Sequence, residues 1–119
     1  MLQSVQSKFI NIANIAKAMD LMNQTHIIND IAFEWDSNKA LLISKTHGVT
    51  FQECATILFN PTTITKQDYR DYGERRFIST GSSDKARILT VVWTERYDKI
   101  RLMTGFLASK DQIKEFYYG

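Results

Sequence analysis

The chain has 119 residues, of which 44% are hydrophobic, enough for one domain with a buried core and too few for two domains. Cys54 is the single cysteine, which excludes a disulfide framework and a zinc site built from cysteines. His26 and His47 are the only imidazoles, so a histidine-rich metal cluster is excluded as well. No apolar run approaches the roughly 20 residues that cross a bilayer. We therefore expect a soluble, cytoplasmic protein that uses no metal and no cofactor.

The net charge of +2 is small but unevenly placed. Residues 1–61 hold four Lys/Arg against five Asp/Glu, and the remainder holds eleven against eight, so a balance of minus one precedes a balance of plus three. Such a total does not by itself indicate nucleic acid, whereas clustering of the cations on one face would. A solvated surface of mixed sign is the alternative.

An amphipathic helix is predicted for residues 3–24. Its apolar stripe has alternating spacings of four and three residues and consists of Val5, Phe9, Ile12, Ala16 and Met19. Such a helix needs a surface to lie against, which can be the domain's own sheet, a second copy or a partner chain. Asn23–Asp30 is polar enough for a linker. We therefore divide the chain into a helix with its linker, residues 1–30, and a folded domain, residues 31–119.

The domain is expected to begin with a strand and two helices. Ile31–Trp35 alternates between apolar and polar residues, as a half-buried strand does. Asp36 can cap a helix through Lys45 that stops at Gly48. Thr50 and Glu53 have the spacing of a capping box for a second helix, Phe51–Phe59, which Asn60-Pro61 ends.

The second half is expected to supply the rest of the sheet. A short strand is predicted for Thr62–Thr65, and three more between Glu74 and Thr104, the most apolar of which is Ile88–Thr94. Ser109 and Gln112 form a capping box for a last helix. The order is β-α-α-β-β-β-β-α after the N-terminal helix. This is an α+β domain in which helices pack against an antiparallel sheet.

A two-residue turn at Tyr97-Asp98 would fix the register of the last hairpin. It would place Arg96 opposite Lys99, Thr94 opposite Arg101, and Val92 opposite Met103. Because side chains alternate along a strand, Thr94, Arg96, Lys99 and Arg101 would then share one face. A bulge at Tyr97 would instead move one strand's set to the other face.

Several short motifs, taken in order, resemble those of the BrnT toxin family of bacterial type II toxin-antitoxin systems. The resemblance spans about residues 31–117 and is carried by Phe33-Glu34-Trp35-Asp36, Lys39, His47-Gly48-Val49-Thr50-Phe51, Asn60-Pro61, Glu74 with Arg76 and Phe77, Thr94-Glu95-Arg96, Ile100-Arg101 and Ala108-Ser109. It implies a fold similar to the RelE group of ribonucleases and cleavage of cellular RNA. It also implies neutralisation by a BrnA-like antitoxin, whose ribbon-helix-helix segment would be the only contact with operator DNA.

Cleavage of RNA without a metal uses the 2′-hydroxyl as nucleophile and needs a base, cations for the phosphorane charge and help for the leaving oxygen. Arg101, Arg76 and Arg96 are the candidates for the phosphate, since a guanidinium binds phosphate oxygens through a planar fork. A surface charge at Arg96 and an ion pair at Arg76 are the alternatives. Thr94 and Lys99 lie beside them in the expected hairpin and are candidates for RNA binding.

The base is either Glu74 or His47, which both match positions of the family, and Lys39 can hold a phosphate or stabilise the leaving group. His47 directly precedes the helix-ending glycine, so capping the last carbonyls is its favoured alternative role. Trp35 is a candidate for stacking on a base, with a core position as the favoured alternative.

The sequence departs from the family where Ser-Ala-Arg is usual, because this chain has Thr104-Gly105-Phe106. Three hypotheses follow. The chain is an RNA endonuclease toxin, a catalytically weakened relative that retains antitoxin binding, or a self-associating protein, for instance a homodimer, in which the N-terminal helix covers the sheet or pairs two copies.

Overall fold

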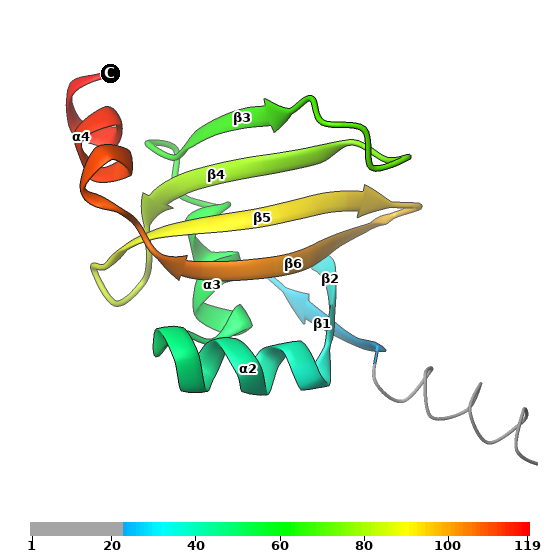
Figure 1. The fold of residues 1–119 in the computed structure, drawn as a ribbon. Coiled ribbons are helices and arrows are strands. Elements are labelled where there is room, and N and C mark those ends of the chain that lie inside the picture. The colour runs from blue at the N-terminus through cyan, green and yellow to red at the C-terminus, as the bar shows by residue number, and fades with distance from the viewer. Residues whose placement is uncertain (1–22) are drawn as a thin grey trace, which may run out of the picture.

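The computed structural model describes residues 23–119, which form one six-stranded sheet and three helices (Figure 1). The strands are β1 Asn23–Ile28, β2 Ile31–Asp36, β3 Ile64–Asp68, β4 Arg76–Ser82, β5 Ile88–Arg96 and β6 Lys99–Leu107. The helices are α2 Ser37–His47, α3 Phe51–Ile57 and α4 Lys110–Tyr118. From β2 onward this confirms the predicted α+β order β-α-α-β-β-β-β-α.

The sheet has the strand order β1-β2-β6-β5-β4-β3. β2 pairs in parallel with β6, and the other neighbouring strands are antiparallel. Figure 1 shows α2 running beside β6, and α4 at the end of the sheet near β3 and β4. The parallel pair was not expected, because the sequence predicts which segments are strands but not which distant strands meet.

Local sequence explains where the helices begin and end. Asp36 accepts hydrogen bonds from the first backbone N–H groups of α2, and Gly48 ends that helix at a φ of 65°, a left-handed value that favours glycine. Thr50 caps α3 through the Glu53 N–H, as predicted. Ser109 and Gln112 form the complete capping box expected for α4.

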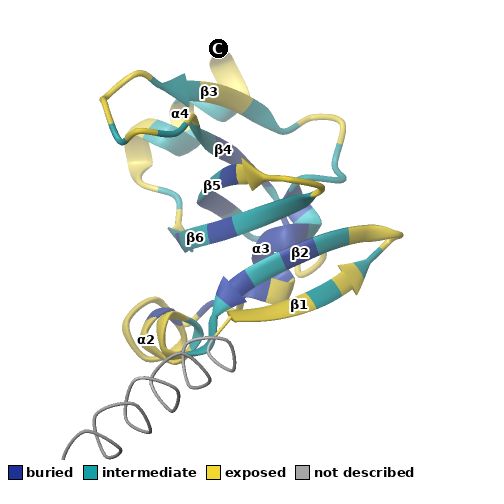
Figure 2. Ribbon diagram, turned by 90° about the vertical axis from the view of Figure 1, so that its right-hand side faces the viewer, coloured by how far each residue is buried: buried dark blue, intermediate teal, exposed yellow. Residues whose placement is uncertain are grey.

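The core lies between one face of the sheet and helices α2 and α3. It contains large aromatic and aliphatic side chains, among them Phe33, Phe51, Ile57, Leu89 and Leu102. Figure 2 shows the buried residues on β2, α3 and the middle strands, whereas α2 is exposed along most of its surface. α3 comes so close to β6 that a Cβ added at Gly105 would lie 2.3 Å from Cys54 Sγ.

α3 and α4 pack on opposite faces of the sheet. Leu89 and Val91 on β5 are fully buried in the core that includes α3. Thr90 between them points the other way, since side chains alternate along a strand, and it donates a hydrogen bond of 2.9 Å to Gln112 Oε1 on α4. Farther along β5 and β6 the same face carries Thr94 and Arg101. We call this face, opposite α3, the open face.

Residues 23–30 are not the expected linker. They form β1 and a tight turn to β2 in which Asn29 and Asp30 have φ values of 48° and 65°, as two-residue hairpin turns of type I′ require. The prediction was wrong because β1 is an exposed edge strand and lacks the alternation of apolar residues. Apart from its last two residues, the helix predicted for residues 3–24 lies outside the described residues.

The register of the last hairpin was predicted correctly at its tip. Arg96 lies opposite Lys99 and Thr94 opposite Arg101, with Tyr97 in the turn at a φ of 56°. The third predicted pair was wrong, because an irregularity between Val92 and Trp93 shifts the register beyond that point. The cationic residues of the tip nevertheless share one face, as expected.

Candidate functional site

Arg101 lies in β6 on the open face, where its guanidinium donates hydrogen bonds to two side chains. Its Nη1 is 3.3 Å from Glu34 Oε1 on β2 and 3.1 Å from Asn23 Oδ1 on β1. The parallel pairing of β2 with β6 places Glu34 directly opposite Arg101. Both charged side chains are only about 15% exposed, so the guanidinium is fixed in place and still reaches solvent.

Lys39 joins Arg101 from the first turn of α2. The two residues line a cavity of about 200 Å³ together with Asp36, Leu102 and Met103. Asp36 Oδ1 accepts hydrogen bonds from the backbone N–H groups of Asn38 and Lys39, which fixes the start of the helix. The lysine therefore projects from a rigid element at the edge of the open face.

Glu74 brings two more arginines together. Its carboxylate oxygens lie 3.5 Å from Arg76 Nε and 3.5 Å from Arg96 Nη2. The guanidinium of Arg76 also lies over the ring of Tyr72, with its central carbon 3.8 Å from the ring centroid. The Tyr72 hydroxyl in turn donates to Asp68 Oδ2 at 3.1 Å. Arg76 is thus placed by a carboxylate on one side and an aromatic face on another.

Thr94 connects these two groups of charges. It is 1% exposed, lies opposite Arg101, and donates its hydroxyl hydrogen bond to the backbone carbonyl of Arg75. This bond holds the segment that carries Glu74 and Arg76 against β5, beside Arg101. Because its hydroxyl is buried and used, Thr94 positions the site, and the predicted direct contact with RNA is not available to it.

Lys99 completes the set, since it lies opposite Arg96 and donates to Thr25 Oγ1 on β1 at 3.1 Å. We call the five cations of this region the cationic cluster: Lys39, Arg76, Arg96, Lys99 and Arg101. Glu34 and Glu74 are the carboxylates that pair with it. Arrayed donors of this kind can bind an anion.

Trp35 and His47 lie outside this cluster. Trp35 is 2% exposed, packs on Phe51 and stacks on His26 with ring centroids 4.0 Å apart, so it takes the core position favoured from the sequence and its ring is not exposed to an RNA base. His47 is eight residues after Lys39 on α2, about 12 Å farther along the helix. There its ring contacts Phe106, with centroids 5.9 Å apart, and the end of α2 is closed by the Gly48 N–H, which donates to the Ser44 carbonyl.

The sequence alone did not identify four residues that contact the cluster, namely Asn23, Thr25, Glu34 and Tyr72. Glu34 alternates with two core aromatics, which indicates that it faces away from the core. Its partner could not be predicted without the parallel pairing of β2. Asn23 and Thr25 were assigned to a linker, and Tyr72 to a polar loop.

The ionisable groups with shifted pKa values, Glu53, Cys54, Asp68 and the partner arginines Arg70 and Arg87, all lie outside the cluster. The side-chain hydrogen bond from Arg87 lowers the pKa of Glu53, against the effect of its burial. Burial raises the pKa of the Cys54 thiol to about 12, which makes it a poor nucleophile. Arg70 holds the pKa of Asp68 well below its usual range, so the acceptor of the Tyr72 hydroxyl stays charged.

Residues 23–119 present neither a metal-binding cluster nor a membrane-spanning helix. No group of three His, Cys, Asp or Glu side chains there is placed to hold a metal ion. The same residues include no helix long and apolar enough to cross a membrane.

Comparisons with known proteins agree with the fold. Residues 35–111 match a family model described as the ribonuclease toxin BrnT of type II toxin-antitoxin systems. The chain is also similar to the crystal structure of the Brucella abortus ribonuclease toxin BrnT, with a TM-score of 0.51 and 18% sequence identity over 64% of this chain and 94% of that one. None of the curated proteins matches.

Proposed function

This chain belongs to the BrnT family of ribonuclease toxins of type II toxin-antitoxin systems, and from this premise we propose that it is an RNA endonuclease that acts through the cationic cluster. The observation that supports the proposal most strongly is the meeting of Lys39, Arg76, Arg96, Lys99 and Arg101 on the open face. These residues come from α2, β4, β5 and β6, so the fold assembles the cluster from segments far apart in the sequence.

The reaction is cleavage by the RNA's own 2′-hydroxyl. Glu74 takes the proton, the 2′-oxygen bonds to phosphorus, and the bond from phosphorus to the 5′-oxygen breaks. The products carry a 2′,3′-cyclic phosphate and a 5′-hydroxyl, and no water or metal is consumed. Lys39 supplies the proton to the leaving 5′-oxygen. His47 is the alternative base, but its place about 12 Å along α2 from Lys39 favours Glu74.

Arg101 and Arg76 stabilise the charge that develops on the phosphorane oxygens. Both guanidiniums are held in advance, Arg101 by Glu34 and Arg76 by Glu74 and Tyr72, so they need no reorganisation during the reaction. Removing one preorganised donor of this kind typically costs about 10²–10³ in kcat. Arg96 and Lys99, at the exposed tip of the hairpin, bind the flanking phosphates.

Membership of a type II toxin-antitoxin family implies an antitoxin partner. The partner that fits best is a BrnA-like protein with a ribbon-helix-helix segment, which would bind operator DNA while this chain would not contact DNA itself. The substrate is cellular RNA in the cytoplasm. An antitoxin that covers the cationic cluster would prevent the phosphates from binding.

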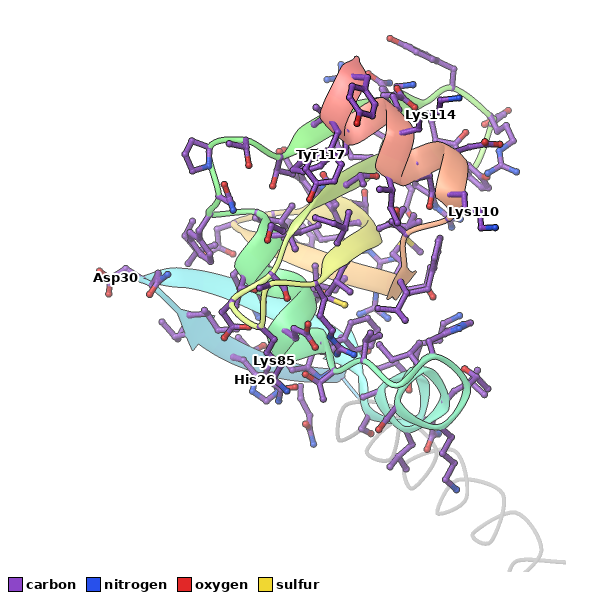
Figure 3. The ribbon with its side chains drawn as sticks, turned by 90° about the vertical axis from the view of Figure 1, so that its left-hand side faces the viewer. His26, Asp30, Lys85, Lys110, Lys114 and Tyr117 are labelled. Carbon is purple, nitrogen blue, oxygen red and sulfur yellow. The ribbon has the colours of Figure 1, made fainter. Side chains whose placement is uncertain are left out.

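Cleavage of a labelled RNA by the purified full chain tests the proposal, with Arg101→Ala as the active-site variant. Lys85→Ala is the matched control, because Lys85 is an exposed cation on the β4–β5 turn (Figure 3), before the first residue of β5, whereas Arg96 of the cluster is its last. We expect cutting by the wild type and the control, and loss of cutting in Arg101→Ala without loss of the folded state by circular dichroism. Equal cutting by all three proteins would refute the proposed site.

A second function is favoured by Phe106, which stands where the family usually has arginine. Phe106 lies within β6, opposite Thr90, and its ring packs near His47. With an aromatic there, one cation for phosphate is lost, and the chain would act as a weakened relative that binds the antitoxin or itself. Phe106→Arg tests this alternative. A rise in cleavage of about 10²-fold supports it, and unchanged cleavage argues for the endonuclease as it stands. Light scattering of the full chain at a dimer's mass would support self-association.

A further inference from the structure

We propose that strand β1 is a working part of the site, in which Asn23 and Thr25 are positioning residues for Arg101 and Lys99. The inference rests on the proposed ribonuclease function and adds to it two residues that precede the family match, which begins at residue 35. Neither residue touches the RNA in this scheme; each acts through the cation that it holds.

The contacts are specific and regularly spaced. Asn23 Oδ1 accepts a hydrogen bond of 3.1 Å from Arg101 Nη1, and Thr25 Oγ1 accepts one of 3.1 Å from Lys99 Nζ. Two residues apart on a strand, Asn23 and Thr25 point to the same face, which is the open face. The two cations are likewise two residues apart on β6, so two partner pairs lie side by side.

The next residue along the strand, His26, anchors β1 on the other face. His26 stacks on Trp35 with the rings 4.0 Å apart and only 6° from parallel. Most of β1 is otherwise exposed, so the strand buries little apolar surface of its own. The stacked ring of His26 and the partly buried Ile28 fix the strand to the core, while Asn23 and Thr25 contact the cations on the open face.

The two acceptors on β1 carry no charge, so they hold Arg101 and Lys99 without offsetting the positive charges that would bind phosphate. Glu34 also holds Arg101 Nη1, but a carboxylate offsets the positive charge that a phosphate would use. The amide of Asn23 and the hydroxyl of Thr25 restrict the cations and leave their charges intact. Asn23 and Glu34 both engage Nη1, and among residues 23–119 no hydrogen bond occupies Nη2 of Arg101, which can donate to phosphate oxygens.

The test compares Asn23→Ala and Thr25→Val, alone and combined, with Gln24→Ala. Gln24 is an exposed polar residue of the same strand that faces away from the open face, so it controls for damage to β1. Valine keeps the β-branched shape of threonine and removes the hydroxyl. All variants are measured as the full chain.

Two readouts separate this inference from the function on which it rests. The first is the rate at which phenylglyoxal modifies Arg101, followed by mass spectrometry with Arg96 as the internal reference. We expect a several-fold faster reaction in Asn23→Ala and no change in Gln24→Ala. The second is single-turnover cleavage of RNA, in which we expect kcat to fall about three- to tenfold in the double variant with little change in KM, in line with the usual worth of a hydrogen bond.

An unchanged modification rate together with an unchanged kcat in the double variant would overturn the role of β1 while the wild type still cleaves. Faster modification in Asn23→Ala, with no cleavage even by the wild type, would overturn the ribonuclease proposal and leave the placement of Arg101 by β1 standing. Equal effects in Gln24→Ala would show that β1 matters only for folding, which also overturns the inference.

Discussion

Replacing Glu74 by glutamine separates the two roles that this carboxylate has in the proposed reaction. Glutamine keeps the shape of the side chain and removes its charge. The proton acceptor for the 2′-hydroxyl is then lost, while Arg76 and Arg96 no longer have an anion 3.5 Å away that competes with phosphate. We therefore expect catalysis and binding to change in opposite directions, with a lower kcat and tighter binding of RNA.

The structure sets the expected size of each change. Loss of a general base costs typically about 10²–10⁴ in rate. One additional phosphate neutralised on a single strand steepens the plot of log K against log salt concentration by about 0.7. Both ion pairs of Glu74 are at least a quarter exposed, and pairs of this kind contribute about 0–1 kcal/mol to stability, so the folded state should be nearly unaffected.

Binding is measured by fluorescence anisotropy at several salt concentrations with a 2′-O-methyl RNA, which lacks the attacking hydroxyl, and kcat by single-turnover cleavage of the unmodified RNA. Glu95→Gln is the matched control. This substitution makes the same charge change at the residue that directly precedes Arg96 on β5. Glu95 is exposed, however, and faces away from the open face. Equal effects of the two substitutions, or full activity in Glu74→Gln, would refute the reasoning.

Three further predictions concern the fold. Arg87→Ala leaves the buried carboxylate of Glu53 without its cationic partner and with only the Ser83 hydroxyl as a side-chain donor, and should lower the free energy of unfolding by about 3 kcal/mol at pH 7 in urea titrations. Because Arg87 lowers the pKa of Glu53 in the folded state, this stabilisation is present above the unfolded pKa of about 4.3 and is lost as the pH falls through the folded pKa. The gap between wild type and variant should therefore shrink in acid, and a constant gap would contradict the assignment. Gly105→Ala should destabilise the chain by about 1–3 kcal/mol, because its Cβ would lie 2.3 Å from Cys54 Sγ. Adding Cys54→Ala to the same chain should restore much of the lost stability. If it restores none, the destabilisation has another cause. The Cys54 thiol, with its pKa raised to about 12, should resist iodoacetamide at pH 8 until the chain is unfolded, and fast alkylation of the folded chain would refute its burial.

Features fixed by local sequence were predictable. The caps at Asp36, Thr50 and Ser109 follow from side chains that bond backbone N–H groups two or three residues away. The pairing of Thr94 with Arg101 follows from a two-residue turn, which determines the register of the residues next to it. These rules need no knowledge of distant segments.

Features that depend on distant segments were not predictable. The Thr50–Glu53 spacing suggested a reciprocal capping box, but the Glu53 side chain instead pairs with Arg87, 34 residues later. Strand β1 has no apolar alternation to reveal it, because the sheet's edge is exposed. The candidate site differs in the same way between local and distant features. Its cations were predicted from the sequence, whereas the residues that contact them could be identified only once the strand order was known.

The most direct test of the central claim is the fate of two matched, labelled RNAs incubated with the purified full chain in EDTA, one unmodified and one with 2′-O-methyl groups throughout. Cleavage by the 2′-hydroxyl predicts that only the unmodified RNA is cut, and that mass spectrometry finds 2′,3′-cyclic phosphate and 5′-hydroxyl ends. Cutting of the methylated RNA, or the absence of cutting in both, would contradict the account.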